Sequence, residues 1–129
     1  TGFGSNNVDH CTRLCHASSV AALLEGVGSG AVSNQVNDVE HSSLIMLICS
    51  NPTANHPVAA TWFKNAAKRG AKIVLCDPRK TDISKHAWRL MQFKPDTDVA
   101  MLNAMIYTII EEGLADKDLL PIVRITTKP

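Results

Sequence analysis

The amino-acid sequence predicts an α/β fold: a Rossmann-like βαβ unit with parallel strands that forms part of a larger fold. Two apolar runs, Leu44–Cys49 and Lys72–Cys76, have the length and composition of buried strands. Cys49 and Cys76, which close these runs, are expected to be buried. Between the runs, Pro57–Lys68 carries an apolar stripe at helical spacing. A strand, a helix and a strand in so short a stretch predict a crossover, so the two strands should be parallel neighbours.

The segment before the first strand is expected to hold a loop, a helix and an irregular stretch. Residues 1–10 are rich in turn-forming residues and favour a loop. Residues 17–25 favour a short helix that Gly26, Gly28 and Gly30 end. Residues 31–43 are polar and irregular, with one short helical turn as an option.

Two elements are expected after the second strand. Residues 90–93 favour a third short strand. Residues 98–112 favour a helix, because apolar residues recur there at helical spacing. Asp98 is expected to cap this helix and Gly113 to end it.

Composition argues against several classes of function. The chain has 129 residues, a net charge of +1 and only 5% aromatic residues, so neither a basic surface nor a base-stacking surface for nucleic acid is expected. No apolar run approaches the roughly 20 residues of a membrane span. No signal peptide is visible, so reduced cysteines are expected. The chain begins without Met and ends in an uncapped run, which suggests a segment of a larger polypeptide.

Polar side chains follow both predicted strands of the βαβ unit. Asn51 comes after the first strand, and Asp77 and Arg79 come after the second. Ligands of open parallel sheets bind outside the carboxyl ends of strands, where a carboxylate suits a ribose hydroxyl or a purine amine. A guanidinium suits a phosphate or a carbonyl edge. The alternative is that these residues only form turns. No Gly-x-Gly-x-x-Gly motif joins strand to helix, so an ordinary NAD site is not predicted.

A second constellation is Cys11-Thr-Arg-Leu-Cys15-His16, just before the first predicted helix. The positive end of a helix favours the thiolate form of a nearby cysteine. Three interpretations stay open on the residues alone. Cys15 has no role beyond its loop, or Cys11, Cys15, His10 and His16 bind zinc. In the third, Cys15 is the single thiolate ligand of a large cofactor, with His16 as a nearby proton carrier.

Together these motifs resemble a known family. Residues 1–20, TGFGSNNVDHCTRLCHASSV, resemble the active-site segment of molybdenum- or tungsten-dependent formate dehydrogenase catalytic (alpha) subunits. These are molybdopterin oxidoreductases of the cysteine-ligand type. The resemblance continues through residues 51–57, 76–79 and 102–114, and covers about residues 1–118 in one order. The cytoplasmic, NAD-linked branch of the family is the most similar.

The resemblance implies an activity and a cofactor for the larger polypeptide. Formate would be oxidised to carbon dioxide at a molybdenum or tungsten centre held by bis-molybdopterin guanine dinucleotide. Cys15 would be the metal ligand, and His16 would take part in proton movement. Electrons would pass to a 4Fe–4S cluster whose ligands lie outside this segment, then to electron-transfer subunits with iron–sulfur and, as an option, flavin- and NAD-binding sites. The segment alone is expected to be inactive.

The resemblance also implies cofactor-binding residues. Val20 would pack near the pterin. One guanine dinucleotide would be contacted by Asn51, Cys76, Asp77 and Arg79. Asp98 would make a further contact with the nucleotide.

The implied organisation is a single segment, residues 1–129, of the molybdopterin-binding α/β domain. Residues 1–43 would form the active-site loop and helix, and residues 44–118 the nucleotide-binding βαβ unit with its following helix. Residues 119–129 form an atypical tail. The family commonly has glycine inside a Pro-Gly-(Ser/Thr)-Asp turn. This chain has Pro95-Asp96-Thr97-Asp98, which puts a positive φ at Asp96 in question.

Three alternatives to formate dehydrogenase stay open. A nitrate reductase-like enzyme of the same family also uses a cysteine ligand, although the Cys15-His16 pair favours formate dehydrogenase. A cofactor-free structural relative in a respiratory complex would be expected to lack the metal-ligating cysteine. A simple nucleotide-binding module would bind guanine nucleotides without any redox chemistry.

Overall fold

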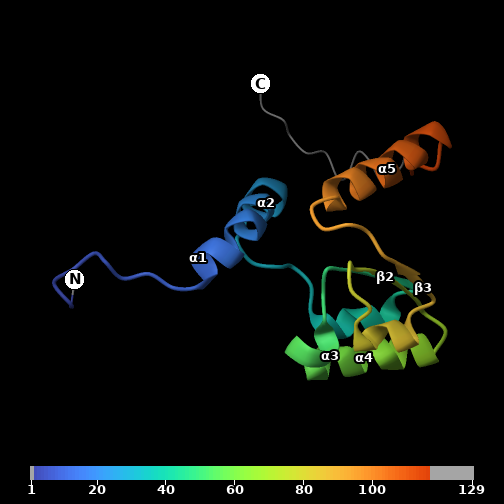
Figure 1. The fold of residues 1–129 in the computed structure, drawn as a ribbon, viewed down its shortest axis with the longest axis horizontal. Coiled ribbons are helices and arrows are strands. Elements are labelled where there is room, and N and C mark those ends of the chain that lie inside the picture. Colours follow the sequence, from blue (N-terminus) through green and yellow to red (C-terminus); the bar gives the residue numbers. More distant parts are fainter. Residues whose placement is uncertain (1, 117–129) are drawn as a thin grey trace. The chain divides into compact units, whose positions relative to one another are not determined.

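The structure, a computed structural model, describes residues 2–116 of the chain. The chain divides into two compact units, with the boundary between Asn34 and Gln35 (Figure 1). The atypical tail expected at residues 119–129 lies outside the described residues.

The first unit carries helices α1 (Thr12–Cys15) and α2 (Ala17–Val27). Helix α2 begins as predicted and runs through Gly26, because it is Gly28 that adopts the left-handed conformation, with φ 74°. The N–H of Gly28 donates to the carbonyl of Leu24 at 3.1 Å and closes the helix. Helix α1 was not predicted. No residue between 2 and 34 is buried, so this part of the chain has no hydrophobic core of its own.

The second unit is built on a three-stranded parallel sheet with the order β1-β2-β3. Ile45 of β1 lies opposite Ile73 of β2, and Val74 of β2 lies opposite Arg89 of β3. The predicted parallel βαβ unit is therefore confirmed. The elements in chain order are η1 (Val36–His41), β1 (Leu44–Ile48), α3 (Pro52–Asn55), α4 (Pro57–Lys68), β2 (Lys72–Cys76), η2 (Asp82–His86), β3 (Arg89–Met91) and α5 (Asp98–Glu111).

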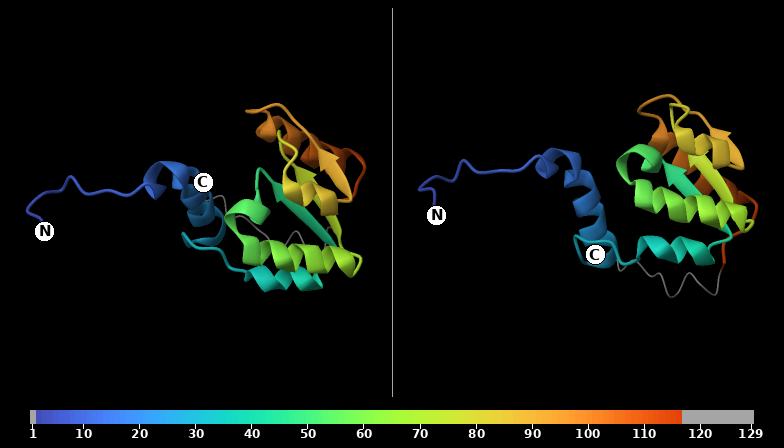
Figure 2. Two further views of the ribbon diagram at one scale, coloured as in Figure 1. Left: turned by 60° about the horizontal axis from the view of Figure 1, so that its bottom comes forward. Right: turned by 90° about the horizontal axis from the view of Figure 1, so that it is seen from below.

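Helix α4 occupies the predicted range because its sequence contains both boundary signals. Pro57 stands in its first turn, where a missing N–H costs nothing, and Gly70 follows it with φ 105°. Figures 1 and 2 show α4 along one face of the sheet and α5 on the opposite side. The core between α4 and the sheet consists of Ile45, Leu47, Ala66, Ile73, Leu75 and Ile83.

Two predictions about the first strand were wrong. Strand β1 was expected to be buried on both faces, but Leu44 is 58% and Met46 40% exposed, while Ile45 and Leu47 are buried. The face of β1 that carries Ile45 and Leu47 is buried in the core with Ala66 of α4, whereas the face that carries Leu44 and Met46 is only partly covered by the described residues. Cys49 was expected to be buried, yet it is exposed with φ 48°, because the strand has already ended at Ile48.

The predicted cap of α5 was also wrong. Thr97 precedes the helix and its carbonyl accepts the N–H of Met101 at 3.0 Å, so Asp98 is the first helical residue. At this position its negative carboxylate interacts favourably with the positive end of the helix dipole. Asp96 adopts φ 65° although it is not glycine, a conformation that aspartate tolerates better than most residues. Gly113 ends the helix with φ 64°, as predicted.

The third strand lies at Arg89–Met91, overlapping the predicted residues 90–93. None of the helices in the described part of the chain is both long and apolar enough to cross a bilayer.

Ile73 tests the packing of the sheet, because its side chain is fully buried at the centre of the core. Ile73→Ala is expected to lower the free energy of unfolding by about 2–5 kcal/mol, since it leaves a cavity under α4. Val99→Ala, at a position 63% exposed, is the control and should change it by less than about 0.5 kcal/mol. Urea denaturation followed by circular dichroism measures both. Equal small effects would contradict the packing described.

The buried hydroxyl of Thr81 leads to a second prediction about stability. Its side chain is 8% exposed, and Oγ1 has no hydrogen-bond partner in the described structure. Thr81→Val removes a desolvated polar group at nearly constant volume, so stability should be unchanged or rise by about 1 kcal/mol. The same denaturation experiment measures the change. A clear loss of stability would show that the hydroxyl has a partner in solution.

Candidate functional site

Cys15 and His16 lie together at the junction of α1 and α2. Cys15 is the last residue of α1, and His16 immediately precedes α2. The Sγ atom of Cys15 lies 3.0 Å from Nδ1 of His16, and both residues are exposed. The N–H of His16 donates to the carbonyl of Thr12 at 3.0 Å, which closes the turn. An exposed thiol beside an imidazole offers a soft metal ligand next to a group that accepts or donates a proton.

Beside this pair, the first unit has an open hollow of about 730 Å³. His16 and Val20 both line it, together with Arg13, Leu23 and Gly30. The predicted proton carrier and the predicted pterin-packing residue therefore share one surface. Most of its lining is apolar, which suits a flat, partly aromatic ligand.

The predicted nucleotide-binding residues lie where β1 and β2 end. Asn51, half-buried, precedes α3, and its Oδ1 accepts the hydroxyl of Thr53 at 2.8 Å. Asp77 is only 4% exposed, and its Oδ1 accepts the backbone N–H of Arg79 at 2.7 Å. The N–H of Asp77 in turn donates to the carbonyl of Met91 at 3.2 Å. These bonds hold the carboxylate in place at the end of the sheet.

Arg79 contrasts with Arg13 and Arg69. Its side chain is exposed, and within residues 2–116 it takes part in none of the ion pairs, whereas Arg13 and Arg69 each pair with a carboxylate. Arg79, two residues after the buried Asp77, thus offers a guanidinium that forms none of the ion pairs among residues 2–116. The two residues bring a donor group and an acceptor group to one edge of the sheet.

The pKa values of two thiols, Cys49 and Cys76, reflect burial and charge at the same edge of the sheet. The pKa of the Cys49 thiol is raised, first by partial burial of the thiol and then by the negative charges of Asp77 and Asp98. The pKa of Cys76 is raised by burial and then by Cys49. The N–H of Cys49 also donates to the carbonyl of Cys76 at 2.9 Å. Cys49 and Cys76 are thus joined at the end of the sheet, and the charges of Asp77 and Asp98 act on the Cys49 thiol.

Cys49 is a residue of this edge that sequence reasoning missed. It was treated as part of a buried strand, although it directly precedes the polar residues Ser50 and Asn51. That position, at the change from apolar to polar residues, was the available signal. Cys49 directly follows β1, and its N–H bonds to the last residue of β2, so it lies at the edge that carries the predicted ligands of the nucleotide.

The zinc interpretation of the first cysteines is not supported. Between residues 2 and 116, no group of three or more His, Cys, Asp and Glu side chains is arranged to hold a metal ion. Cys11, Cys15, His10 and His16 therefore do not form a tetrahedral site. A single thiolate that completes the coordination of a metal held by a large cofactor needs no such cluster.

Comparison with known proteins agrees with the motifs. The model of the family "Molybdopterin oxidoreductase" matches residues 1–126. Formate dehydrogenase H of Escherichia coli is 44% identical over 115 residues, which are 89% of this chain and 16% of that protein. The F420-dependent formate dehydrogenase subunit alpha of Methanocaldococcus jannaschii is 42% identical over 114 residues, 88% of this chain and 17% of that protein.

A similar protein of Methanococcus maripaludis, F420-dependent formate dehydrogenase 1 subunit alpha, is 39% identical over 118 residues, 92% of this chain and 18% of its own length. The chain thus spans less than a fifth of the length of these relatives. The family match covers nearly all of the chain, both the segment with Cys15 and the parallel βαβ unit. The chain belongs to the molybdopterin oxidoreductase family.

Proposed function

We propose that this chain is part of the catalytic subunit of a formate dehydrogenase, which oxidises formate to carbon dioxide. The observation that carries the proposal is the exposed Cys15–His16 pair, with Sγ and Nδ1 3.0 Å apart. It lies in a segment similar to proteins named formate dehydrogenases. Neither a nitrate reductase-like activity nor a cofactor-free structural role has a comparable observation in its favour.

The residues of the first unit fit a metal bound by a pterin cofactor. Cys15 offers one exposed soft ligand, and the hollow lined by His16 and Val20 offers a mostly apolar surface beside it. When bound, molybdenum or tungsten in a bis-molybdopterin guanine dinucleotide supplies two-electron redox chemistry. Cys15 would hold the metal, and Val20 would pack near the pterin. His16, in contact with the thiol, would hold and move the proton released from formate.

The residues of the second unit fit one guanine nucleotide of that cofactor. Guanine presents N–H donors on one edge and the acceptors O6 and N7 on another. The buried Asp77 carboxylate would accept from the donors, and the guanidinium of Arg79 would donate to carbonyl or phosphate oxygens. Asn51 and Asp98 would contact the same nucleotide, and the buried Cys76 would pack beneath it.

Electron transfer would involve groups outside this chain. We propose a 4Fe–4S cluster in the full-length polypeptide and separate electron-transfer subunits, with flavin and NAD sites as an option. Two of the relatives are named F420-dependent, so the acceptor differs among similar proteins. We also propose a cytoplasmic location, because the sequence resembles the cytoplasmic, NAD-linked branch of the family.

Cys15→Ser in the full-length polypeptide tests the metal ligand. Replacing a soft thiolate by a hydroxyl should reduce formate oxidation to below about a hundredth of the wild-type rate, since even orienting neighbours of metal ligands cost 10–100-fold. Cys11→Ser, which changes the other exposed cysteine of the same segment, is the matched control and should stay near wild type. Rates are measured with an artificial electron acceptor under anaerobic conditions. Undiminished turnover of Cys15→Ser would refute the assignment.

Asp77→Asn tests the nucleotide site separately. Loss of a buried carboxylate that accepts hydrogen bonds should weaken nucleotide retention about 10- to 100-fold, as expected for one charge-assisted bond. The readout is the amount of guanosine monophosphate released by acid from each purified polypeptide. Lys80→Ala, at an exposed neighbouring position, serves as the control. An Asp77→Asn protein with the full nucleotide content would show that Asp77 does not bind the guanine.

A further inference from the structure

The turn that carries Cys15 lacks the packing that normally fixes a helix. Helix α1 has only four residues, and none of them is buried. A single helical turn is unstable in water by itself, because several dihedral angles are fixed for very few hydrogen bonds. Local polar contacts must therefore set its geometry within the described part of the chain.

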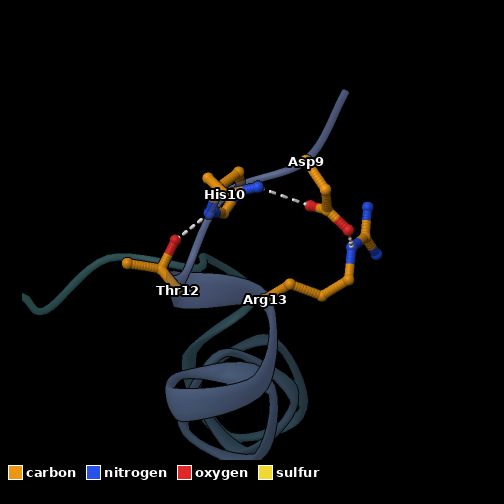
Figure 3. Close-up of polar contacts among 4 residues, drawn as sticks. All are labelled: Asp9, His10, Thr12 and Arg13. Atoms are coloured by element: carbon orange, nitrogen blue, oxygen red, sulfur yellow. Dashed lines mark hydrogen bonds and ion pairs between the residues drawn. The ribbon is translucent and has the colours of Figure 1, made fainter. Parts of the chain in front are cut away.

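Figure 3 shows these contacts just before and within α1. One carboxylate oxygen of Asp9, Oδ1, accepts the backbone N–H of His10 at 2.8 Å. The other, Oδ2, accepts a hydrogen bond from Nε of Arg13 at 2.5 Å. The same contact is an ion pair between residues four positions apart in the sequence. The hydroxyl of Thr12 contacts Nδ1 of His10, and the N–H of Arg13 donates to the carbonyl of His10 at 3.2 Å.

These contacts join the chain before α1 to the middle of α1. Asp9 uses both oxygens, one on the incoming backbone and one on a side chain of the turn. Cys15 follows Arg13 by two residues in the same turn, so a change in the geometry of that turn would also change the direction of its Sγ. We propose that Asp9 and Arg13 are positioning residues, a clamp that orients the Cys15 thiolate toward the metal. This proposal rests on the proposed function of Cys15 as a metal ligand.

The charges of the clamp are largely in water, which separates orientation from overall stability. The Arg13 side chain is 69% exposed and that of Asp9 50%. Exposed ion pairs of this spacing contribute little to global stability. Variants that break the clamp are therefore expected to fold and to take up metal, with the effect confined to the geometry around Cys15.

Arg13 has a competing role that the test must separate. It also lines the hollow shared by His16 and Val20, so its guanidinium could contact an anionic ligand there. In that case Arg13 would matter by itself and Asp9 would not. The clamp requires instead that either partner, removed alone, has the same effect.

A double-mutant cycle in the full-length polypeptide distinguishes these roles. The variants are Asp9→Asn, Arg13→Gln and the two combined. Asp82→Asn, which removes the exposed 3.3 Å ion pair with Lys85, is the matched control. The readouts are metal content, the electron paramagnetic resonance spectrum of the metal, kcat and KM. In the metal-free polypeptide, a fifth readout is the alkylation rate of Cys15 relative to Cys11.

The clamp predicts that each single variant keeps its metal within about twofold and lowers kcat about 10- to 100-fold, as orienting residues of metal ligands do. KM should stay within about twofold, because the ground-state binding of formate is not changed. The metal spectrum and the Cys15 alkylation rate should both change, and the double variant should be no worse than either single one. Asp82→Asn should match wild type in every readout.

Three results would overturn the proposal. These are a wild-type spectrum and alkylation rate in Asp9→Asn, an effect of Arg13→Gln alone, or effects that add in the double variant. Failure of the underlying function is recognised separately with Cys15→Ser. If that variant leaves the metal spectrum unchanged, Cys15 is not a ligand. If it changes the spectrum while both clamp variants resemble wild type, only the clamp is wrong.

Discussion

Parallel pairing between β1 and β2 determines where the polar residues of the second unit lie. Because parallel strands end at the same edge of a sheet, the pairing of Ile48 with Cys76 brings the residues after both strands together. Cys49 and Asn51, which follow β1, therefore lie at the same edge of the sheet as Asp77, which follows β2, although Asp77 is far from both in sequence. The core between α4 and the sheet supplies the apolar burial that holds this register, and a shift by one residue would turn Ile73 out of the core. The nucleotide site we propose depends on this one alignment.

The first unit follows a different physical principle. Between residues 2 and 34 no side chain is buried, so the segment with Cys15 is held by local hydrogen bonds and by the left-handed glycine that ends α2. Leu14 and Val20 are among its exposed apolar residues, and contacts that bury such side chains would stabilise this segment. The second unit is therefore held by a packed core, whereas the first carries an exposed thiol on a weakly supported turn. In the proposed enzyme, ligation of the metal would itself add a strong restraint to that turn.

Much of the fold followed from local patterns, and the failures have identifiable causes. Helix α4 and the parallel strand pair were predicted correctly because their signals are local in sequence. Pro57 and Gly70 mark the ends of the helix, and two apolar runs mark the strands. The short helices α1 and α3 were missed, since one turn leaves no periodicity to detect. The burial of Leu44 and Met46 was overestimated because burial depends on what covers a face, which an apolar run does not state. The family was recognisable from the motifs around Cys15 and Asp77, whereas the roles of those residues stay predictions.

The most direct test of the account is the X-ray absorption spectrum of the metal in the anaerobically purified full-length polypeptide, compared with its Cys15→Ser variant. The account predicts molybdenum or tungsten at about one atom per polypeptide, with sulfur neighbours in the wild type and one sulfur fewer in the variant. The absorption edge also identifies which of the two metals is bound. A wild-type protein without either metal, or an unchanged sulfur shell in the variant, would contradict the central claim that Cys15 is a metal ligand.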